Sequence, residues 1–502
     1  MKRIMALLLA LLLALSGLWA LAEEMSVVEL EAQTVAPEAQ VAEADLLLPE
    51  EATEAPEASE AEPNASKGVK ISKANFPDPE FRTYVKNSFD TDGDGQLSAA
   101  EAGAVTWMAF GTNDGVTYVK CKNAKGLQFF PNLEELDIIG KEDTLVPLTA
   151  LDVTQNPNLK ILRIYSTSLS KLNVSKNTAL EELEVSNNSN ITALNLSKNT
   201  KLVTLNLWEN SLKSLDLKKC GQLEHLDVHG NKLKSLNVSK CANLQLLFCE
   251  NNKLSALNVG GCPLLRDFRC ENNGLKKLDV SKNGDLLYLY CGGNKLTALD
   301  VSKNTNLKEL FCWENKLTGL DVSKNTELTN LSVAVQKKPF KAIDVSKNRK
   351  LTNLDVSINR ISRIDVSKNK KLTWLDVTGN RLTELDVTGL TKLKRLWCGE
   401  NPIKALNLKK NGKLWQLWAW GLGVTSLDVS ANTALKDLRV HGNAIKKLDI
   451  GKCSKLVSLV KDTHMTSDGE EVMWIQNEEN YMLEISKDTK LYSGKKVLYK
   501  GA

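Results

Sequence analysis

The sequence predicts an elongated solenoid of 21-residue repeats with a parallel β-sheet, β-dominated within the α/β repeat class. Two observations support this prediction: Leu-Asp-Val-Ser-Lys-Asn recurs along most of the 502 residues, and apolar residues recur at fixed offsets within each copy. Length alone would allow about three globular domains at ~150 residues each, but that expectation assumes a chain without internal repeats. A multi-domain enzyme is therefore the less favoured interpretation.

Residues 1–22 have the composition of a secretory signal peptide. Lys2 and Arg3 precede an apolar run over residues 4–15, and Ala20-Leu21-Ala22 is a small-residue cleavage pattern. We expect cleavage after Ala22, a secreted or extracellular-surface location, and no transmembrane segment in the mature chain. An uncleaved membrane anchor stays open as the alternative, because residues 6–22 are at the low end of spanning length.

Residues 23–66 predict a disordered acidic spacer rich in Ala, Pro and Glu. They hold 13 acidic residues and no Lys or Arg, so they repel one another and cannot bury enough apolar surface to offset chain entropy. Removing these 13 from 61 acids leaves 48, and removing Lys2 and Arg3 from 65 bases leaves 63, so residues 67–502 carry about +15. The repeated Lys of the Ser-Lys-Asn turns is interpreted as a solvated edge, and secretion argues against a nucleic-acid partner.

Residues 90–101 have the composition of a calcium-binding loop. Oxygen-bearing residues occupy loop positions 1, 3, 5, 9 and 12, Gly95 occupies position 6, and Leu97 occupies position 8. Ca²⁺ requires six to eight oxygen ligands. The expected ligands are the side chains of Asp90, Asp92 and Asp94, the carbonyl of Gln96, Ser98 through a bridging water, and both carboxylate oxygens of Glu101. An acidic turn that holds a helix pair without metal is the alternative.

This loop resembles an EF-hand, and the match covers every liganding position. The resemblance implies Ca²⁺ as a cofactor within a small helical N-terminal cap, residues 67–124. Ser98 and Glu101 can also form a capping box at the start of the second helix. EF-hands normally pair, and the sequence contains no second loop. We therefore expect the loop to clamp the first repeat rather than to sense calcium.

The repeat array is expected to extend over residues 125–459. Fifteen Leu-Asp-Val-like triplets are spaced by 21 residues in twelve of fourteen intervals. Counting the first residue of each triplet as position 0 (Leu299, for example), apolar residues recur at 0, +2, +8, +11, +13 and +18, and Asn at +5 and +16. The stacked Asn at +16 should be buried and hydrogen-bonded to adjacent coils. Nine of the ten Cys occupy +5 or +13, which predicts core thiols, although neighbours on adjacent coils could oxidise.

The second half of each unit has the form of a leucine-rich repeat, as in Leu307-x-x-Leu310-x-Cys312-x-x-Asn315-x-Leu317. With the Phe76-Pro-Asp78 segment, the calcium loop and the Leu-Asp-Val-Ser-Lys-Asn units, the chain resembles secreted leucine-rich repeat proteins of Firmicutes and is loosely internalin-like. The resemblance implies protein–protein or host-surface binding, with adhesion typical of internalins. It supplies no binding residues. We expect a monomer.

Aromatic residues gather on the predicted outer face of the sheet. Residues at +12 and +14 point away from the core, and neighbouring strands lie ~5 Å apart, so two exposed aromatic patches are expected to bind a ligand. A protein ligand is the first expectation, and a surface glycan or cell-wall polysaccharide is the alternative. Mutual shielding of the rings without any ligand also stays open. The candidate ligand-binding residues are Trp208, Phe248, Tyr290, Phe311, Trp313, Trp397, Trp418 and Trp420.

No catalytic motif is found, and we expect no enzyme activity. His225 and His229 lie ~13 Å apart on a predicted strand, too far to share a zinc ion, and nucleophile-elbow, P-loop and HExxH motifs are absent. Two irregularities interrupt the array. The unit from Leu320 carries two extra residues within 334–340, a kink or a binding loop, and the period is lost from residue 460, which predicts a C-terminal β cap over residues 460–502.

Overall fold

The computed structural model describes residues 68–113, 115–462, 466–467 and 472–501. The chain divides into two units, Met1–Ala65 and Ser66–Ala502, and every described residue belongs to the second. The predicted signal peptide and acidic spacer therefore lie outside the described residues. Among the helices that are described, none has the length and apolar character needed to cross a membrane.

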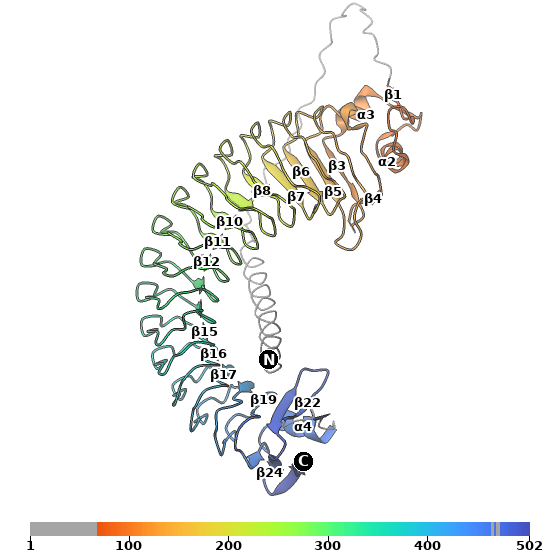
Figure 1. Ribbon diagram of the computed structural model, residues 1–502. Coiled ribbons are helices and arrows are strands. Elements are labelled where there is room, and N and C mark those ends of the chain that lie inside the picture. Colours follow the sequence, from red (N-terminus) through yellow and green to blue (C-terminus); the bar gives the residue numbers. More distant parts are fainter. Residues whose placement is uncertain (1–67, 114, 463–465, 468–471, 502) are drawn as a thin grey trace, which may run out of the picture. The chain divides into compact units, whose positions relative to one another are not determined.

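One parallel sheet runs through the second unit, and each coil of the array contributes one strand to it (Figure 1). The strands are β3 Trp107–Gly111, β4 Thr117–Tyr118, β5 Glu135–Ile139, β6 Ile161–Tyr165, β7 Glu182–Ser186, β8 Thr204–Asn206, β9 His225–Asp227, β10 Leu246–Phe248, β11 Asp267–Arg269, β12 Tyr288–Tyr290, β13 Glu309–Phe311, β14 Asn330–Ser332, β15 Asn353–Asp355, β16 Trp374–Asp376, β17 Arg395–Trp397, β18 Gln416–Trp418 and β19 Asp437–Arg439. Strand β5 pairs with β3, and the short β4 pairs only with the end of β3. From β5 to β19 successive strands pair in constant register, so that Leu289 lies beside Leu310 and Leu310 beside Leu331. This stack of one strand per coil confirms the predicted solenoid of 21-residue repeats.

Alternate residues of each coil build the core. In the coil of β12, Leu289 and Cys291 are fully buried, whereas Tyr288 and Tyr290 are half-buried on the outer face of the sheet. Each buried Leu contributes roughly 1.5–3 kcal/mol by leaving water. Because no coil can bury its apolar side alone, the coils stabilise one another only when stacked.

The Asn side chains at +16 form a ladder that uses both ends of the amide. The Oδ1 of Asn315 accepts from the backbone N–H of Leu296 in the preceding coil (2.9 Å). Its Nδ2 donates to the carbonyls of Cys291 (3.0 Å) and Cys312 (3.2 Å). Asn294 and other members repeat this pattern. The predicted structural role of these Asn residues is confirmed.

A second ladder at +5 uses only the donor end of the amide. The Nδ2 of Asn304 donates to the carbonyls of Val280 (3.0 Å) and Asn283 (2.7 Å), while its Oδ1 is buried without a hydrogen-bond partner. The S–H of a thiol can donate in the same way, and its sulfur is only a weak acceptor. Cys therefore fits this position without leaving a buried oxygen unpaired. The Sγ of Cys262 donates to the carbonyl of Val238 (3.4 Å). All ten cysteines are buried and unpaired, which confirms core thiols.

The two extra residues of the unit from Leu320 leave the ladder intact. Gln336 occupies +16; its Oε1 accepts from the N–H of Leu317 (3.1 Å) and its Nε2 donates to the carbonyl of Cys312 (2.9 Å). Phe340 is fully buried where other coils place Leu, Ile or Val at +18, and its N–H donates to Oδ1 of Asn359 (2.9 Å). The insertion is therefore confined to the turn that follows β14.

The N-terminal cap contains β1 Val69–Lys70, α2 Pro79–Phe89, β2 Gln96–Leu97 and α3 Ala99–Ala104, and the 3₁₀ helix η1 Leu127–Phe129 follows at the start of the array. Asp78 begins α2, where its Oδ1 accepts from the N–H groups of Glu80 and Phe81. Its Oδ2 accepts from the N–H of Lys122 (2.8 Å), which ties the helix to the start of the array. The buried rings of Phe81 and Phe110 lie 5.5 Å apart and join the two cores.

The C-terminal end consists of β20 Lys447–Asp449, α4 Ser454–Asp462, β21 Thr466–Ser467, β22 Val472–Gln476, β23 Met482–Ser486, β24 Lys490–Ser493 and β25 Lys496–Tyr499. Strand β23 pairs in parallel with β19 and so takes the place of the next coil's strand. Helix α4 begins where the sequence suggests further repeat. Leu456 and Leu459 lie in this helix and are buried. Their spacing of three residues fits the apolar face of a helix as well as the repeat pattern.

Candidate functional site

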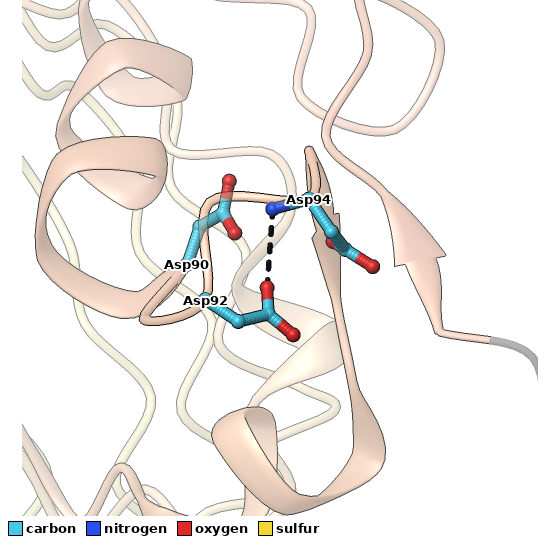
Figure 2. Close-up of side chains that lie close together, drawn as sticks. All are labelled: Asp90, Asp92 and Asp94. Atoms are coloured by element: carbon cyan, nitrogen blue, oxygen red, sulfur yellow. Dashed lines mark hydrogen bonds between the residues drawn. The ribbon is translucent and has the colours of Figure 1, made fainter.

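The loop between α2 and α3 brings three carboxylates together (Figure 2). Oxygens of Asp90, Asp92 and Asp94 lie within 4.8 Å of one another. Asp92 accepts from the N–H of Asp94 (3.1 Å), and Asp94 accepts from the N–H of Gln96 (2.6 Å), so the backbone wraps around the group. Asp90 Oδ2 accepts from Gly95 (3.2 Å), whereas its Oδ1 is shielded from solvent and has no hydrogen-bond partner. A divalent cation would stabilise this orphaned oxygen and its two charged neighbours.

The other predicted ligands are held in local hydrogen bonds. Glu101 is outside the close group: its Oε1 accepts from the N–H and hydroxyl of Thr91 (2.6 and 2.7 Å), and its Oε2 from the N–H and hydroxyl of Ser98 (2.9 and 2.8 Å). These hydrogen bonds, with that from the Thr91 side chain the strongest, lower the pKa of Glu101 to about 2. Ser98 and Glu101 form the predicted capping box. The Gln96 side chain donates to Asp94 (3.2 Å).

A strand from the start of the described unit pairs with the calcium-type loop. Strand β1 pairs antiparallel with β2, with Lys70 opposite Gln96, and the N–H of Ile71 donates to the carbonyl of Gly95 (2.9 Å). Strand β1 therefore occupies the free edge of β2, and its backbone hydrogen bonds hold the loop between α2 and α3 in place.

The first group of predicted aromatic residues is organised around an arginine. The guanidinium of Arg269 lies 4.6 Å from the ring centre of Phe248 and 5.1 Å from that of Tyr290, so a cation separates two rings expected to form one patch. Tyr290 contacts Phe311 with 4.9 Å between ring centres. Its hydroxyl donates to Oε2 of Glu309 (2.6 Å).

Two further predicted tryptophans lie flat on neighbouring coils. A Cβ added to Gly292 would stand 2.3 Å from the indole of Trp313, so the absent side chain of this glycine makes room for the ring. Trp208 belongs to a separate group. It stacks on His229 with 5.4 Å between ring centres and an angle of 5°, and it also contacts Tyr165.

Trp397, Trp418 and Trp420 form the second group, as the repeat register predicts. Trp397 and Trp418 stack at 4.0 Å with 9° between their planes, and Trp418 lies 5.9 Å from Trp420. The Nε1 of Trp397 donates to Gln416 (2.9 Å), and the Nε1 of Trp418 donates to Asp437 (3.0 Å). Stacking and hydrogen bonds together fix these rings in one orientation.

The eight predicted aromatic residues are half-buried, so the expectation of exposed patches is wrong in this respect. Strands of adjacent coils are so close that each ring covers its neighbour. The more exposed aromatic residues are Trp107 (57%) and Tyr118 (61%), in β3 and β4, which precede the periodic part of the sequence. A prediction based on the repeat could not include them.

Three aromatic neighbours were missed by the sequence reasoning. Trp374 packs edge-on against Trp397 (5.4 Å), and His441 stacks on Trp420 (6.1 Å, 7°), as His229 does on Trp208. Position +10 faces the same side as +12, so the same register would have identified Trp374. The histidines lie in the +14 row itself, but only large aromatic residues were selected from that row.

The strand face is acidic, although residues 67–502 are basic in sum. At positions +10, +12 and +14 from β5 to β19 there are twelve acidic residues and four Arg. Burial, together with the charge of Glu250, raises the pKa of Glu271 to about 8, and burial raises that of Glu250 to about 7. The Oε2 of each is shielded from solvent and has no hydrogen-bond partner. The acidic residues are Glu135, Asp137, Glu182, Glu184, Asp227, Glu250, Asp267, Glu271, Glu309, Asp355, Asp376 and Asp437.

The fold is that of a leucine-rich repeat solenoid. It is similar to the functional domain of InlJ from Listeria monocytogenes, which includes a cysteine ladder: 26% of residues are identical, the TM-score is 0.64, and 86% of this chain and 100% of that chain are covered. It is also similar to the leucine-rich repeat protein LIC12759 of Leptospira interrogans, at 23% identity and a TM-score of 0.52, over 64% of this chain and 87% of that chain. No protein-family model and no curated protein matches the sequence.

Proposed function

We propose that this chain is a secreted or surface-exposed binding protein whose strand face holds a protein partner and which serves in adhesion to a host or cell surface. The observation that carries the proposal is the cluster of Trp397, Trp418 and Trp420 on that face. The signal-type segment at residues 1–22 supports secretion. Similarity to an internalin-type fold supports a binding role without catalysis.

The tryptophan cluster is suited to binding because it is already rigid. The 4.0 Å stack of Trp397 on Trp418, and the hydrogen bonds of both indoles, restrict the rings before any partner arrives. Little side-chain entropy is then lost on association. Aromatic and Arg side chains contribute most to protein interfaces, and Arg439 lies 4.1 Å above Trp418.

The charge of the strand face indicates what kind of protein surface it would hold. Burial raises the pKa of Glu250, Glu271 and Asp376, but the other nine acidic residues still outnumber the four Arg and give the face a negative potential on an otherwise basic body. Opposite potentials speed encounter and disfavour wrong partners. The partner is therefore expected to present Lys or Arg around an apolar centre.

The geometry of the rings favours a protein over a glycan. A sugar stacks on a free aromatic face, but one face of Trp397 is covered by Trp418, and Arg439 lies over Trp418. Because these ring faces are covered, a partner would contact mainly the edges of the rings in this half-buried cluster. Edges suit the mixed apolar and polar contacts of a protein interface.

The test compares the wild-type chain with a Trp397→Ala, Trp418→Ala, Trp420→Ala variant. Both are applied to immobilised extracellular proteins and, separately, to immobilised cellulose and xylan. Binding to protein should weaken at least ~10-fold, which corresponds to ~1.4 kcal/mol. The control Leu264→Ala, which changes an exposed apolar residue outside the strands, should bind as the wild type. Wild-type affinity in the triple variant, or binding to polysaccharide alone, would reject a protein-binding strand face.

We also propose that Ca²⁺ is held in the N-terminal loop by Asp90, Asp92 and Asp94, with the carbonyl of Gln96. Its charge would offset the repulsion among three carboxylates within 4.8 Å and give a partner to the orphaned Oδ1 of Asp90. Glu101 and Ser98 are the remaining ligands on the EF-hand pattern, and Glu101 would have to leave its hydrogen bonds with Thr91 to serve. The role proposed for the ion is to stabilise the cap.

A further inference from the structure

A row of basic side chains follows the edge of the sheet at which each strand turns back. Position +17, directly after the ladder Asn or Gln, is Lys or Arg in seven of eight successive coils, and Gly274 is the exception. Six of the seven side chains are exposed and Lys316 is half-buried. We call this row the basic stripe; its members are Lys232, Lys253, Lys295, Lys316, Lys337, Arg360 and Arg381.

Backbone hydrogen bonds between coils fix the spacing of the basic stripe. The N–H of Lys316 donates to the carbonyl of Leu296, that of Arg360 to Phe340, and that of Arg381 to Ile361, each at 2.9 Å. Strands of adjacent coils are ~4.8 Å apart. Cationic side chains therefore recur about every 5 Å on a backbone that cannot rearrange.

The charge of this edge is not neutralised by neighbours. Five successive turns, residues 294–298, 315–319, 336–342, 359–363 and 380–384, contain eight basic residues and one acidic residue, Glu384, and a second acidic residue, Glu314, directly precedes the turn at 315–319. Within the described ranges, no member of the basic stripe forms an ion pair.

The lysines at the opposite turns are different, because each follows an Asp at +1. Hydrogen bonds from Ser281, with a smaller contribution from the charge of Lys282, lower the pKa of Asp279. Asp300 and Lys303 repeat this arrangement one coil later. The Ser-Lys-Asn edge therefore carries local counter-charges that the basic stripe lacks.

The insertion deepens the basic stripe into a shallow hollow of about 580 Å³. Lys337, Lys338, Lys341 and Arg360 line it, with Thr318 and Pro339, and no acidic residue does. Gln336 and Phe340 keep the ladder and the core of this coil, so the two extra residues between them are not required for packing. What they add is charge and concavity at the middle of the row.

We propose that the basic stripe and this hollow bind an anionic polysaccharide that lies along the stack, with its carboxylate or sulfate groups beside successive coils. A polymer with one anionic group per sugar presents charges at an interval comparable to the coil spacing. Each exposed contact is weak and screened by salt, so binding depends on several contacts made at once. This site is separate from the strand face and does not rest on the function proposed above.

The test measures binding of the full chain to polygalacturonate, dextran sulfate, neutral dextran and polyglutamate by calorimetry at low salt. One variant carries Lys295→Gln, Lys316→Gln, Lys337→Gln and Arg360→Gln. Its matched control carries Lys282→Gln, Lys303→Gln, Lys324→Gln and Lys347→Gln, which removes the same charge from the opposite turns of the same four coils.

The wild type should bind polygalacturonate if the site prefers carboxylates, or dextran sulfate if it prefers sulfates. It should not bind neutral dextran. The stripe variant should lose on the order of tenfold or more in affinity, the matched control less than about twofold, and raised salt should weaken the wild type most. Equal losses in the two variants would overturn the proposal in favour of net charge. Equally tight binding of polyglutamate would overturn it in favour of an acidic protein, and absence of binding to both anionic polysaccharides would refute it outright.

Discussion

The two amide ladders predict opposite outcomes for the same substitution within one coil. Asn315→Cys removes the Oδ1 that accepts from the N–H of Leu296. It also replaces the Nδ2 that donates to the carbonyls of Cys291 and Cys312 by a weaker thiol donor. A buried unsatisfied N–H costs ~1–3 kcal/mol and a lost hydrogen bond ~1 kcal/mol, so local stability should fall by ~2–4 kcal/mol.

Asn304→Cys, eleven residues earlier, is the matched control. Asn304 only donates, and its buried Oδ1 has no partner. A thiol preserves a weaker donor and removes the orphaned oxygen, so the cost should stay within about 1 kcal/mol. The chain already carries Cys at this position in other coils, such as Cys241 and Cys262.

Native-state hydrogen exchange is the suitable assay, because a long repeat array need not unfold in two states. The amide of Leu296 should exchange faster by about 30-fold or more in Asn315→Cys, as expected for a loss of ~2–4 kcal/mol. It should change by less than about tenfold in Asn304→Cys. Equal effects of the two substitutions would show that the acceptor half of the ladder does not stabilise the stack.

Three further predictions follow from the cap, the strand face and the tryptophan cluster. Millimolar Ca²⁺ should raise the unfolding temperature of the cap, and Asp90→Ala should abolish the rise; an unchanged melt with and without chelator would reject the site. Because the pKa of Glu271 is raised from 4.5 to about 8, its contribution to stability is present below pH 4.5 and lost as pH rises through 8. Glu271→Gln should therefore raise stability at pH 9 by at least ~1 kcal/mol relative to its effect at pH 5, and equal effects at both pH values would contradict the shift. Gly399→Ala, whose Cβ would stand 2.6 Å from Trp420, should displace that indole and change its fluorescence, whereas Gly389→Ala, with nothing within 4 Å, should not.

The repeat period was sufficient to predict the solenoid, its strands and its ladders. Each coil packs against its neighbours in the same way, so the pattern of buried residues at Leu310, Cys312 and Asn315 is repeated wherever the spacing is 21. The unit from Leu320 shows how strong this constraint is, since Gln336 and Phe340 restore ladder and core around two extra residues. Helix α4 could not be predicted in this way, because its apolar residues fit either pattern.

The candidate sites could be predicted only as far as backbone position determines them. Asp90, Asp92 and Asp94 meet because they alternate in one tight loop. The orientation of Glu101 depends on hydrogen bonds from Thr91, which occupies a loop position that the calcium-binding pattern does not specify. The strand-face rows were likewise correct in register, but burial of the rings depends on which neighbours stack on them, as Trp397 and Trp418 show.

Site-specific photo-crosslinking tests the central claim, a protein-binding strand face, most directly. A photoreactive phenylalanine analogue replaces Thr378, which lies on the strand face one coil before Gly399, or Lys324, which is exposed at the Ser-Lys-Asn turns. With a preparation of extracellular proteins, we expect a discrete crosslinked protein from position 378 and none from position 324, and the product should disappear when Trp397, Trp418 and Trp420 are replaced by Ala. A crosslink from position 324 without one from position 378 would contradict the account.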